Sequence, residues 1–143
     1  MSIVIVRGPH GRGPSLPAEL FNHLRQQALQ AGRTLELRAC GALRDFVEQV
    51  GAARSEVTEF VLLDPGDLAP EMRAHPEAGL SEAIDDLRVP YIDVHDEFGD
   101  ERACCAGLHK PPTATVIING NIGSGYRIGL RLALRHLKIG GDR

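Results

Sequence analysis

Five short apolar segments, separated by longer stretches, constrain the fold of this chain more than any other feature. Each segment is rich in β-branched and other apolar residues and ends in turn formers, which is typical of buried strands. Four other stretches repeat apolar residues at helical spacing. We expect strands at SIVIVR (2–7), TLELRAC (34–40), TEFVLLD (58–64), PYIDV (90–94) and ATVIIN (114–119), and helices at 17–32, 42–53, 79–87 and 124–138.

This alternation predicts an α/β fold in which helices cover both faces of a parallel sheet, because parallel strands need crossover connections. With five strands, we expect the flavodoxin-like three-layer sandwich with strand order 2-1-3-4-5. A chain of 143 residues suits one domain spanning residues 1–143. The helical residues expected to face the core are Leu20, Phe21, Leu24, Ala28 and Leu29 in the first helix, and Ile128, Leu132 and either Ala133 or Leu137 in the last.

Composition and charge exclude several classes of function. The net charge of -3 leaves no basic surface for nucleic acid. No apolar stretch approaches the roughly 18 to 20 residues of a membrane span, and the first residues lack the layout of a signal peptide. The three cysteines, Cys40, Cys104 and Cys105, show no metal-ligand spacing. We therefore expect a reduced, cytoplasmic protein that needs no metal or other cofactor.

Histidines and loop charges gather just after the first, third and fourth strands, in RGPHGRG (7–13), DPGDLAPEMRAH (64–75) and HDEFGDER (95–102). In open α/β sheets, ligands bind beyond these carboxyl ends, where the strand order reverses. His95 follows its strand directly, and Asp93 lies on the same strand face, where it can orient the imidazole and raise its pKa. His95 is therefore a candidate general acid or base. The alternative is a half-exposed histidine near a surface aspartate.

Two glycine-rich stretches each allow two interpretations. NGNIGSGYRIGL (119–130) opens a helix after a strand, but its spacing is not the G-x-G-x-x-G of dinucleotide sites. Its glycines either permit close packing of helix on sheet or let the helix N-terminus hold a small anion. RGPHGRG offers Arg7, His10 and Arg12, which suit a carboxylate or phosphate. Otherwise it is a solvated surface loop.

Taken together, these segments resemble the type II 3-dehydroquinate dehydratases over nearly the whole chain. The resemblance is carried by IVRGPHG, DPG, VPYIDVH and INGNIGSGYRIGLRLAL, the last with the Gly125-Tyr126 pair that opens the family's final helix. It implies a flavodoxin-like lyase of the shikimate pathway that acts on a small molecule. It also implies a homo-oligomer built from trimers, typically a dodecamer.

The resemblance also implies roles for individual residues. His95 matches the general acid that protonates the departing hydroxyl, Asp93 matches the carboxylate that orients it, and His75 matches a second active-site histidine. The remaining candidates, as substrate-binding residues, are His10, Arg12, Asp64, Glu82, Glu97 and Arg102.

The chain departs from the family pattern where the family removes the substrate's proton. The family carries the tyrosine that does so on a lid after the first strand, and this chain has no tyrosine before Tyr91. Asp64 stands where the family has an asparagine that positions a water. Asp96 and Glu97 replace a Ser-Asn pair that binds the substrate carboxylate. Because a general base is worth about 10²–10⁴ in rate, we expect slow turnover of 3-dehydroquinate and a less anionic substrate.

Two hypotheses follow. The first is a divergent lyase or related cyclase of shikimate or specialised metabolism. It would act on a small cyclic hydroxylated or carbonyl compound through His95, with His75, Asp64 or Glu97 as the second partner. The second is a non-catalytic homologue that keeps the oligomeric scaffold and binds a ligand or a protein. The retained Asp93–His95 pair favours the enzyme, whereas the loss of the lid favours the scaffold.

Overall fold

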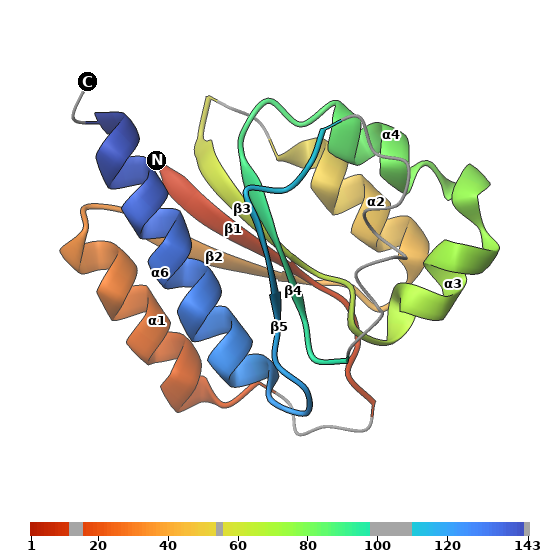
Figure 1. The fold of residues 1–143 in the computed structure, drawn as a ribbon, viewed down its shortest axis with the longest axis horizontal. Helices are drawn as coiled ribbons and strands as arrows, with labels where there is room; N and C mark the ends of the chain where they lie inside the picture. Colours follow the sequence, from red (N-terminus) through yellow and green to blue (C-terminus); the bar gives the residue numbers. More distant parts are fainter. Residues whose placement is uncertain (12–15, 54–55, 98–109, 142–143) are drawn as a thin grey trace.

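The computed structural model describes residues 1–11, 16–53, 56–97 and 110–141. Its five strands form one parallel sheet in the order β2-β1-β3-β4-β5, which confirms the expected flavodoxin-like arrangement (Figure 1). The strands are β1 (Ser2–Arg7), β2 (Thr34–Ala39), β3 (Thr58–Asp64), β4 (Tyr91–His95) and β5 (Ala114–Ile117).

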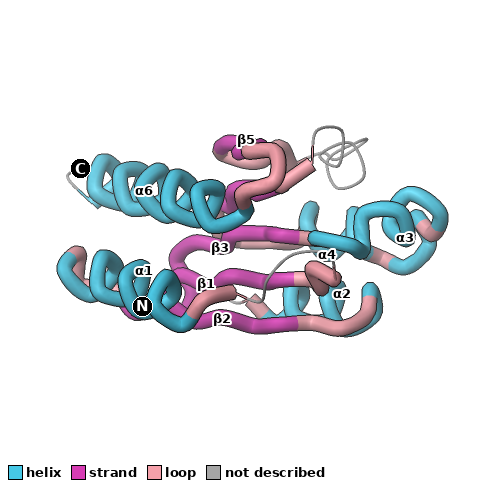
Figure 2. Tube along the Cα trace, turned by 90° about the horizontal axis from the view of Figure 1, so that it is seen from below, coloured by secondary structure: helices cyan, strands magenta, loops and turns pink. Residues whose placement is uncertain are grey.

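Helices cover both faces of the sheet (Figure 2). One layer holds α1 (Ala18–Gln30) and α6 (Ile122–Gly141), and the other holds α2 (Leu43–Ala52), α3 (Ala69–Ala74) and α4 (Leu80–Asp85), with the short 3₁₀ turns η1 (Gly66–Leu68) and η2 (Pro76–Ala78). No helix among the described residues is long and apolar enough to cross a membrane.

The segment 64–75 differs from its expected form. The sequence pattern predicts no helix there, but the structure has η1 followed by α3. Pro70 lies in the first turn of α3, where its missing N–H costs no hydrogen bond. Pro65, Gly66 and Pro70 lie within this short segment and are turn and loop signals, so the pattern did not reveal the helix.

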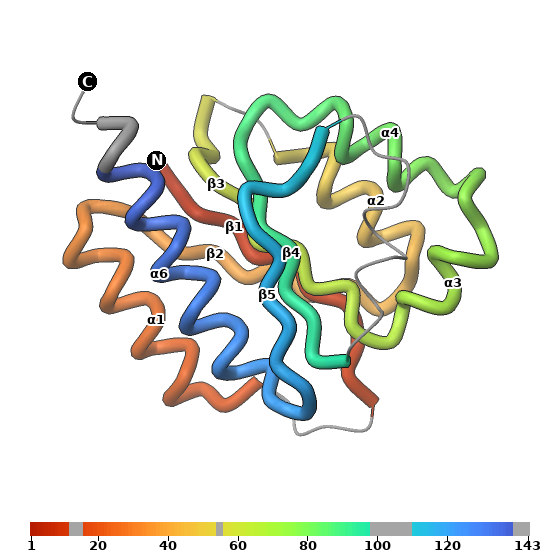
Figure 3. Tube along the Cα trace, in the orientation of Figure 1, coloured from red at the N-terminus to blue at the C-terminus, as the bar shows by residue number. Residues whose placement is uncertain are grey.

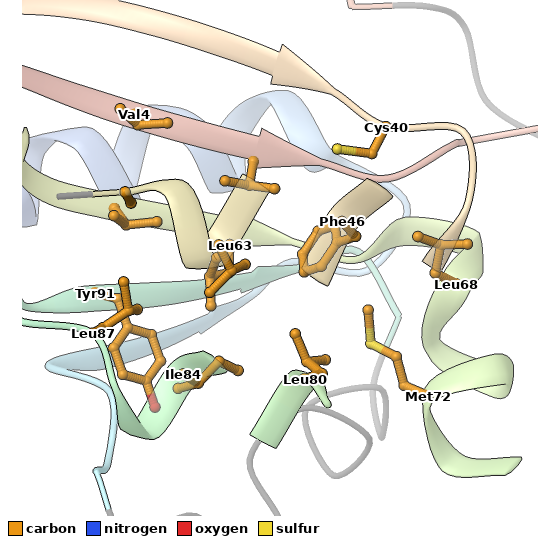
Figure 4. Packing of buried hydrophobic residues seen from close by; sticks show 14 of the residues in the cluster. Val4, Cys40, Phe46, Leu63, Leu68, Met72, Leu80, Ile84, Leu87 and Tyr91 are labelled. Atoms are coloured by element: carbon orange, nitrogen blue, oxygen red, sulfur yellow. The ribbon is translucent and has the colours of Figure 1, made fainter. Parts of the chain in front are cut away.

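Successive strand residues bury their side chains in opposite layers, which gives the molecule two cores. Leu63 and Tyr91 pack with Phe46 of α2 on one face (Figure 4). Leu62 and Val94 pack with α1 and α6 on the other face. The side of the sheet that a strand residue faces therefore decides which helices it meets.

The buried faces of the two long helices differ slightly from the expected ones. In α1 the buried stripe is Leu20, Leu24 and Ala28, and Leu29 is exposed. Ile128 of α6 is also exposed, against expectation. An α-helix advances about 100° per residue, so a residue next to a buried stripe can already point to solvent.

The glycines of α6 have a packing role, as the first interpretation of that stretch predicts. A Cβ atom at Gly125 would approach Cγ1 of Val94 to 2.8 Å, and one at Gly129 would approach its Cγ2 to 3.3 Å. The helix therefore lies so close to β4 that a side chain at Gly125 would force a shift.

Candidate active site

Two charged residues meet where the order of the strands reverses. Arg7 ends β1, Asp64 ends β3, and the two are register partners in the sheet. This is the carboxyl edge at which open α/β sheets bind ligands. Both are buried, Asp64 completely. Because the preceding residues, Val6 and Leu63, face the α2–α4 layer, Arg7 and Asp64 face α6.

Tyr126 of α6 joins these two residues in a buried network. Arg7 Nη1 donates to the Tyr126 hydroxyl at 2.8 Å, and that hydroxyl donates to Asp64 Oδ2. Arg7 Nη1 also lies 3.6 Å from Asp64 Oδ2. Burial, reinforced by the Asp64 charge, raises the pKa of Tyr126 far above its ordinary value. The phenol therefore stays protonated and acts as a donor to Asp64.

His10 lies against the same carboxylate. Its Nε2 is 2.8 Å from Asp64 Oδ2, its Nδ1 is 3.4 Å from Asp96 Oδ2, and its side chain is only 6% exposed. Burial by itself lowers the pKa of His10. The hydrogen bond and charge of Asp64, with a smaller effect of Asp96, outweigh burial and the Arg7 charge, so the pKa is raised above 6.5. A ring with an acceptor at each nitrogen suits the doubly protonated imidazolium.

Backbone hydrogen bonds hold the loop that carries His10 against the loop after β3. Gly8 N donates to Asp64 O and Asp67 N donates to Pro9 O, both at 2.7 Å. Gly11 N donates to the Asp67 carboxylate at 2.5 Å. The first loop is thus tied to its neighbour on both sides of His10.

Glycine is required on both sides of this contact. A Cβ atom at Gly8 would lie 2.1 Å from the Pro65 carbonyl oxygen, which no side chain can tolerate. Gly66 has φ of 57°, and a Cβ atom there would come within 2.9 Å of His10 Nε2. These two glycines let the loops approach closely enough for His10 to reach Asp64.

A pocket of about 660 Å³ opens beside His10, and its size suits a small-molecule ligand. It lies where the first turns of α1 and α6 come side by side (Figure 3). The Asp96 side chain, which lines it, is 32% exposed. Its charged and polar lining includes His10, Glu19, His23, Asp96, Asn121, Ser124 and Arg127, and its apolar lining includes Leu16, Leu20 and Ile122.

Known proteins resemble this chain over nearly its whole length. A 3-dehydroquinate dehydratase of Stutzerimonas stutzeri is 27% identical over 147 residues, covering 96% of this chain and 90% of that protein. The type II dehydroquinase structure from Propionibacterium acnes matches with a TM-score of 0.68 at 19% identity, covering 94% and 98% of the two chains. The chain is thus similar in sequence to curated 3-dehydroquinate dehydratases and similar in fold to type II dehydroquinases.

Other comparisons agree on the fold. A 3-dehydroquinate dehydratase-like protein from Bifidobacterium longum matches with a TM-score of 0.60 at 21% identity, covering 96% of this chain and 98% of that one. No protein-family model matches the chain.

In this dehydroquinase relative, the predicted Asp93–His95 pair lies on the other face of the sheet from the pocket. Asp93 and His95 alternate with Val94, which packs toward α6, so they face the α2–α4 layer. His95 is only 2% exposed, and neither residue lines the pocket beside His10. His95 is therefore not the half-exposed surface histidine of the alternative interpretation. Its catalytic role stays a prediction.

The remaining predicted residues are not brought together. The exposed His75 pairs with Glu77 at 2.9 Å, beside a separate hollow of about 510 Å³ against α2. Glu82 on α4 and Glu97 after β4 are also exposed. Arg12 and Arg102 lie outside the described residues. Of the predicted substrate-binding residues, only His10 and Asp64 are in contact within the described part of the chain.

The sequence analysis missed that His10 and Asp64 form the oriented carboxylate–histidine pair. A signal was present, because both follow strands that are neighbours in the order 2-1-3-4-5. Asp96, which follows β4, and Tyr126 of α6 complete the cluster. Within the described ranges, no group of three or more histidine, cysteine, aspartate or glutamate side chains is arranged to hold a metal ion.

Proposed function

We propose that this protein is a lyase of the dehydratase type, which removes water from a small hydroxylated carbonyl compound by acid–base chemistry centred on His10. One observation carries the proposal: His10 lies beside the pocket with Nε2 bound to the buried Asp64 and Nδ1 directed to Asp96. A buried carboxylate that fixes one ring nitrogen leaves the other for proton transfer. The relatives named 3-dehydroquinate dehydratase support the class of reaction.

Elimination of water from a β-hydroxy ketone needs a base and an acid. In the proposed reaction, the Asp96 carboxylate accepts the proton from the carbon next to the carbonyl. The neighbouring C–O bond breaks, a C=C bond forms, and the hydroxyl leaves as water with the proton from His10 Nδ1. A proton then passes from Asp96 to His10 across their 3.4 Å contact and restores both groups.

The charges near the pocket favour a substrate without a carboxylate there. Two carboxylates, Asp96 and Glu19, line the pocket together with one arginine, Arg127, and Glu97 follows Asp96 directly, so negative charge gathers around Asp96. Like charges at such distances repel, and the repulsion is stronger where water is excluded. We therefore propose a neutral hydroxylated ketone as substrate and slow turnover of 3-dehydroquinate, which is a carboxylate.

The test is an elimination assay that follows the ultraviolet absorbance of the conjugated product. It uses 3-dehydroquinate and its neutral amide analogue, with the exposed His136 changed to Gln as the control variant. His10→Gln should lower turnover by about 10²-fold or more, as loss of an acid–base group does. If His95→Ala loses turnover and His10→Gln keeps it, the chemistry depends on His95 and the proposal is refuted. No turnover of either compound would favour a non-catalytic homologue.

We also propose a homo-oligomer built from trimers, on the strength of the resemblance to the type II 3-dehydroquinate dehydratases. Light scattering that gives the mass of a single chain, 15.5 kDa, would contradict it.

A further inference from the structure

We propose that Arg7 and Tyr126 are positioning residues that set how tightly His10 holds its proton, and that they act through Asp64. The catalytic meaning of this inference rests on the proposed function, but the proton affinity of His10 can be measured without any substrate. The pocket does not include Arg7 or Tyr126 in its lining, so neither is placed to touch a ligand there.

The inference starts from the shared use of one oxygen atom. Asp64 Oδ2 accepts from the Tyr126 hydroxyl, lies 2.8 Å from His10 Nε2 and lies 3.6 Å from Arg7 Nη1. The other carboxylate oxygen, Oδ1, is buried and has no hydrogen-bond partner among the described residues. Two hydrogen-bonding groups, Tyr126 and His10, and the Arg7 charge therefore act on the same oxygen. Each weakens the interaction of the carboxylate with the other two.

Tyr126 and Arg7 remain donors at any ordinary pH. Arginine stays protonated in proteins, and burial keeps the proton on the phenol. The Arg7 charge also opposes a second positive charge on the nearby His10. Without these groups, Asp64 would bind the His10 proton more tightly, and the imidazolium would release it less readily to a leaving hydroxyl.

The other charged groups around His10 do not belong to this network. Asp96, after β4, contacts Nδ1 and favours the imidazolium from the pocket side. Asp67 of η1 accepts from the backbone of the same loop at Gly11. The remaining charged or titratable groups that line the pocket, Glu19 and His23 of α1 and Arg127 of α6, are exposed.

The experiment is a proton NMR titration of the His10 ring, assigned by the signal that disappears in His10→Gln. In Tyr126→Phe, which removes one oxygen atom, the midpoint should move to higher pH. Arg7→Gln should move it in the same direction, and Arg7→Lys, which keeps the charge, should move it less. The control is Arg44→Gln, since the Arg44 side chain on α2 is 87% exposed and its loss should leave the midpoint in place.

An unchanged or lowered midpoint in Tyr126→Phe would overturn the inference, and this variant decides the question even if Arg7→Gln fails to fold. An equal shift in Arg44→Gln would also overturn it, because the effect would then be one of net charge. Where activity is found, the basic limb of the pH–rate profile should move with the midpoint. If the titration midpoint of His10 shifts but the basic limb of the pH–rate profile does not, Arg7 and Tyr126 set the proton affinity of His10. The catalytic role of His10 is then refuted.

Discussion

Replacing Asp64 by Asn keeps the shape of the buried side chain and removes its charge, so it isolates what that charge does. Asp64 is fully buried and faces Arg7, Tyr126 and His10. In Asp64→Asn, Arg7 remains buried without its counter-charge. The contributions that raise the pKa of His10 are largely lost, while burial still lowers it. We therefore expect a less stable protein in which His10 loses its proton at a lower pH.

The cost can be estimated from the contact itself. Two unit charges 3.6 Å apart, as in the Arg7–Asp64 pair, attract by about 4–5 kcal/mol at an effective dielectric constant of about 20. Removing one partner of a buried pair costs about 3–5 kcal/mol, because the remaining charge keeps its desolvation penalty. Small domains are stable by about 5–15 kcal/mol, so Asp64→Asn should fold with a much reduced margin.

Urea denaturation at pH 7, followed by circular dichroism, measures this loss. With a slope of about 2 kcal/mol per M, the midpoint should fall by about 2 M. The control is Asp86→Asn, at an exposed position directly after α4. It should change the free energy of unfolding by less than about 0.5 kcal/mol. The double variant Arg7→Gln/Asp64→Asn should be more stable than the sum of the two losses predicts. A cost below about 1 kcal/mol, or strictly additive losses, would refute the buried-pair interpretation.

The other predictions concern the loops and the helix that frame the site. Gly8→Ala should cost more than the roughly 1–3 kcal/mol of ordinary overpacking, because its Cβ would lie 2.1 Å from Pro65 backbone; an unchanged melting temperature would contradict this. Gly125→Ala should cost about 1–3 kcal/mol in the same assay, since the 2.8 Å contact with Val94 involves a side chain that can shift. His10→Gln should lower stability most below pH 6.5, because the raised pKa of His10 stabilises the fold there. That difference in stability should shrink as the pH rises through the folded-state pKa of His10. Urea midpoints measured from about pH 5 to 9 test this, and a difference that grows with pH would contradict it.

The order of the elements could be predicted from local pattern alone. The β-branched runs, such as SIVIVR of β1, are short, end in turn formers and are rich in residues that favour strands. The need for crossover connections then makes the sheet parallel. The tight glycine contacts of α6 with β4 were likewise one of the two roles expected for that stretch. The short helix α3 was not predicted because Pro65, Gly66 and Pro70 indicate turns in and just before it.

The composition of the site depended on tertiary structure. The sequence shows that Asp93 and His95 share a strand face, but it does not show which layer that face meets. The twist and packing of the sheet decided this, and they placed Val94, not His95, on the side of α6 and the pocket. His10 and Asp64 are 54 residues apart and come into contact only because β1 and β3 are neighbours at the edge where the strand order reverses. The sequence by itself therefore determined the scaffold and the edge at which chemistry is expected. Only the close approach of two loops, each with a glycine where no side chain fits, decided which histidine contacts the buried Asp64 beside the pocket.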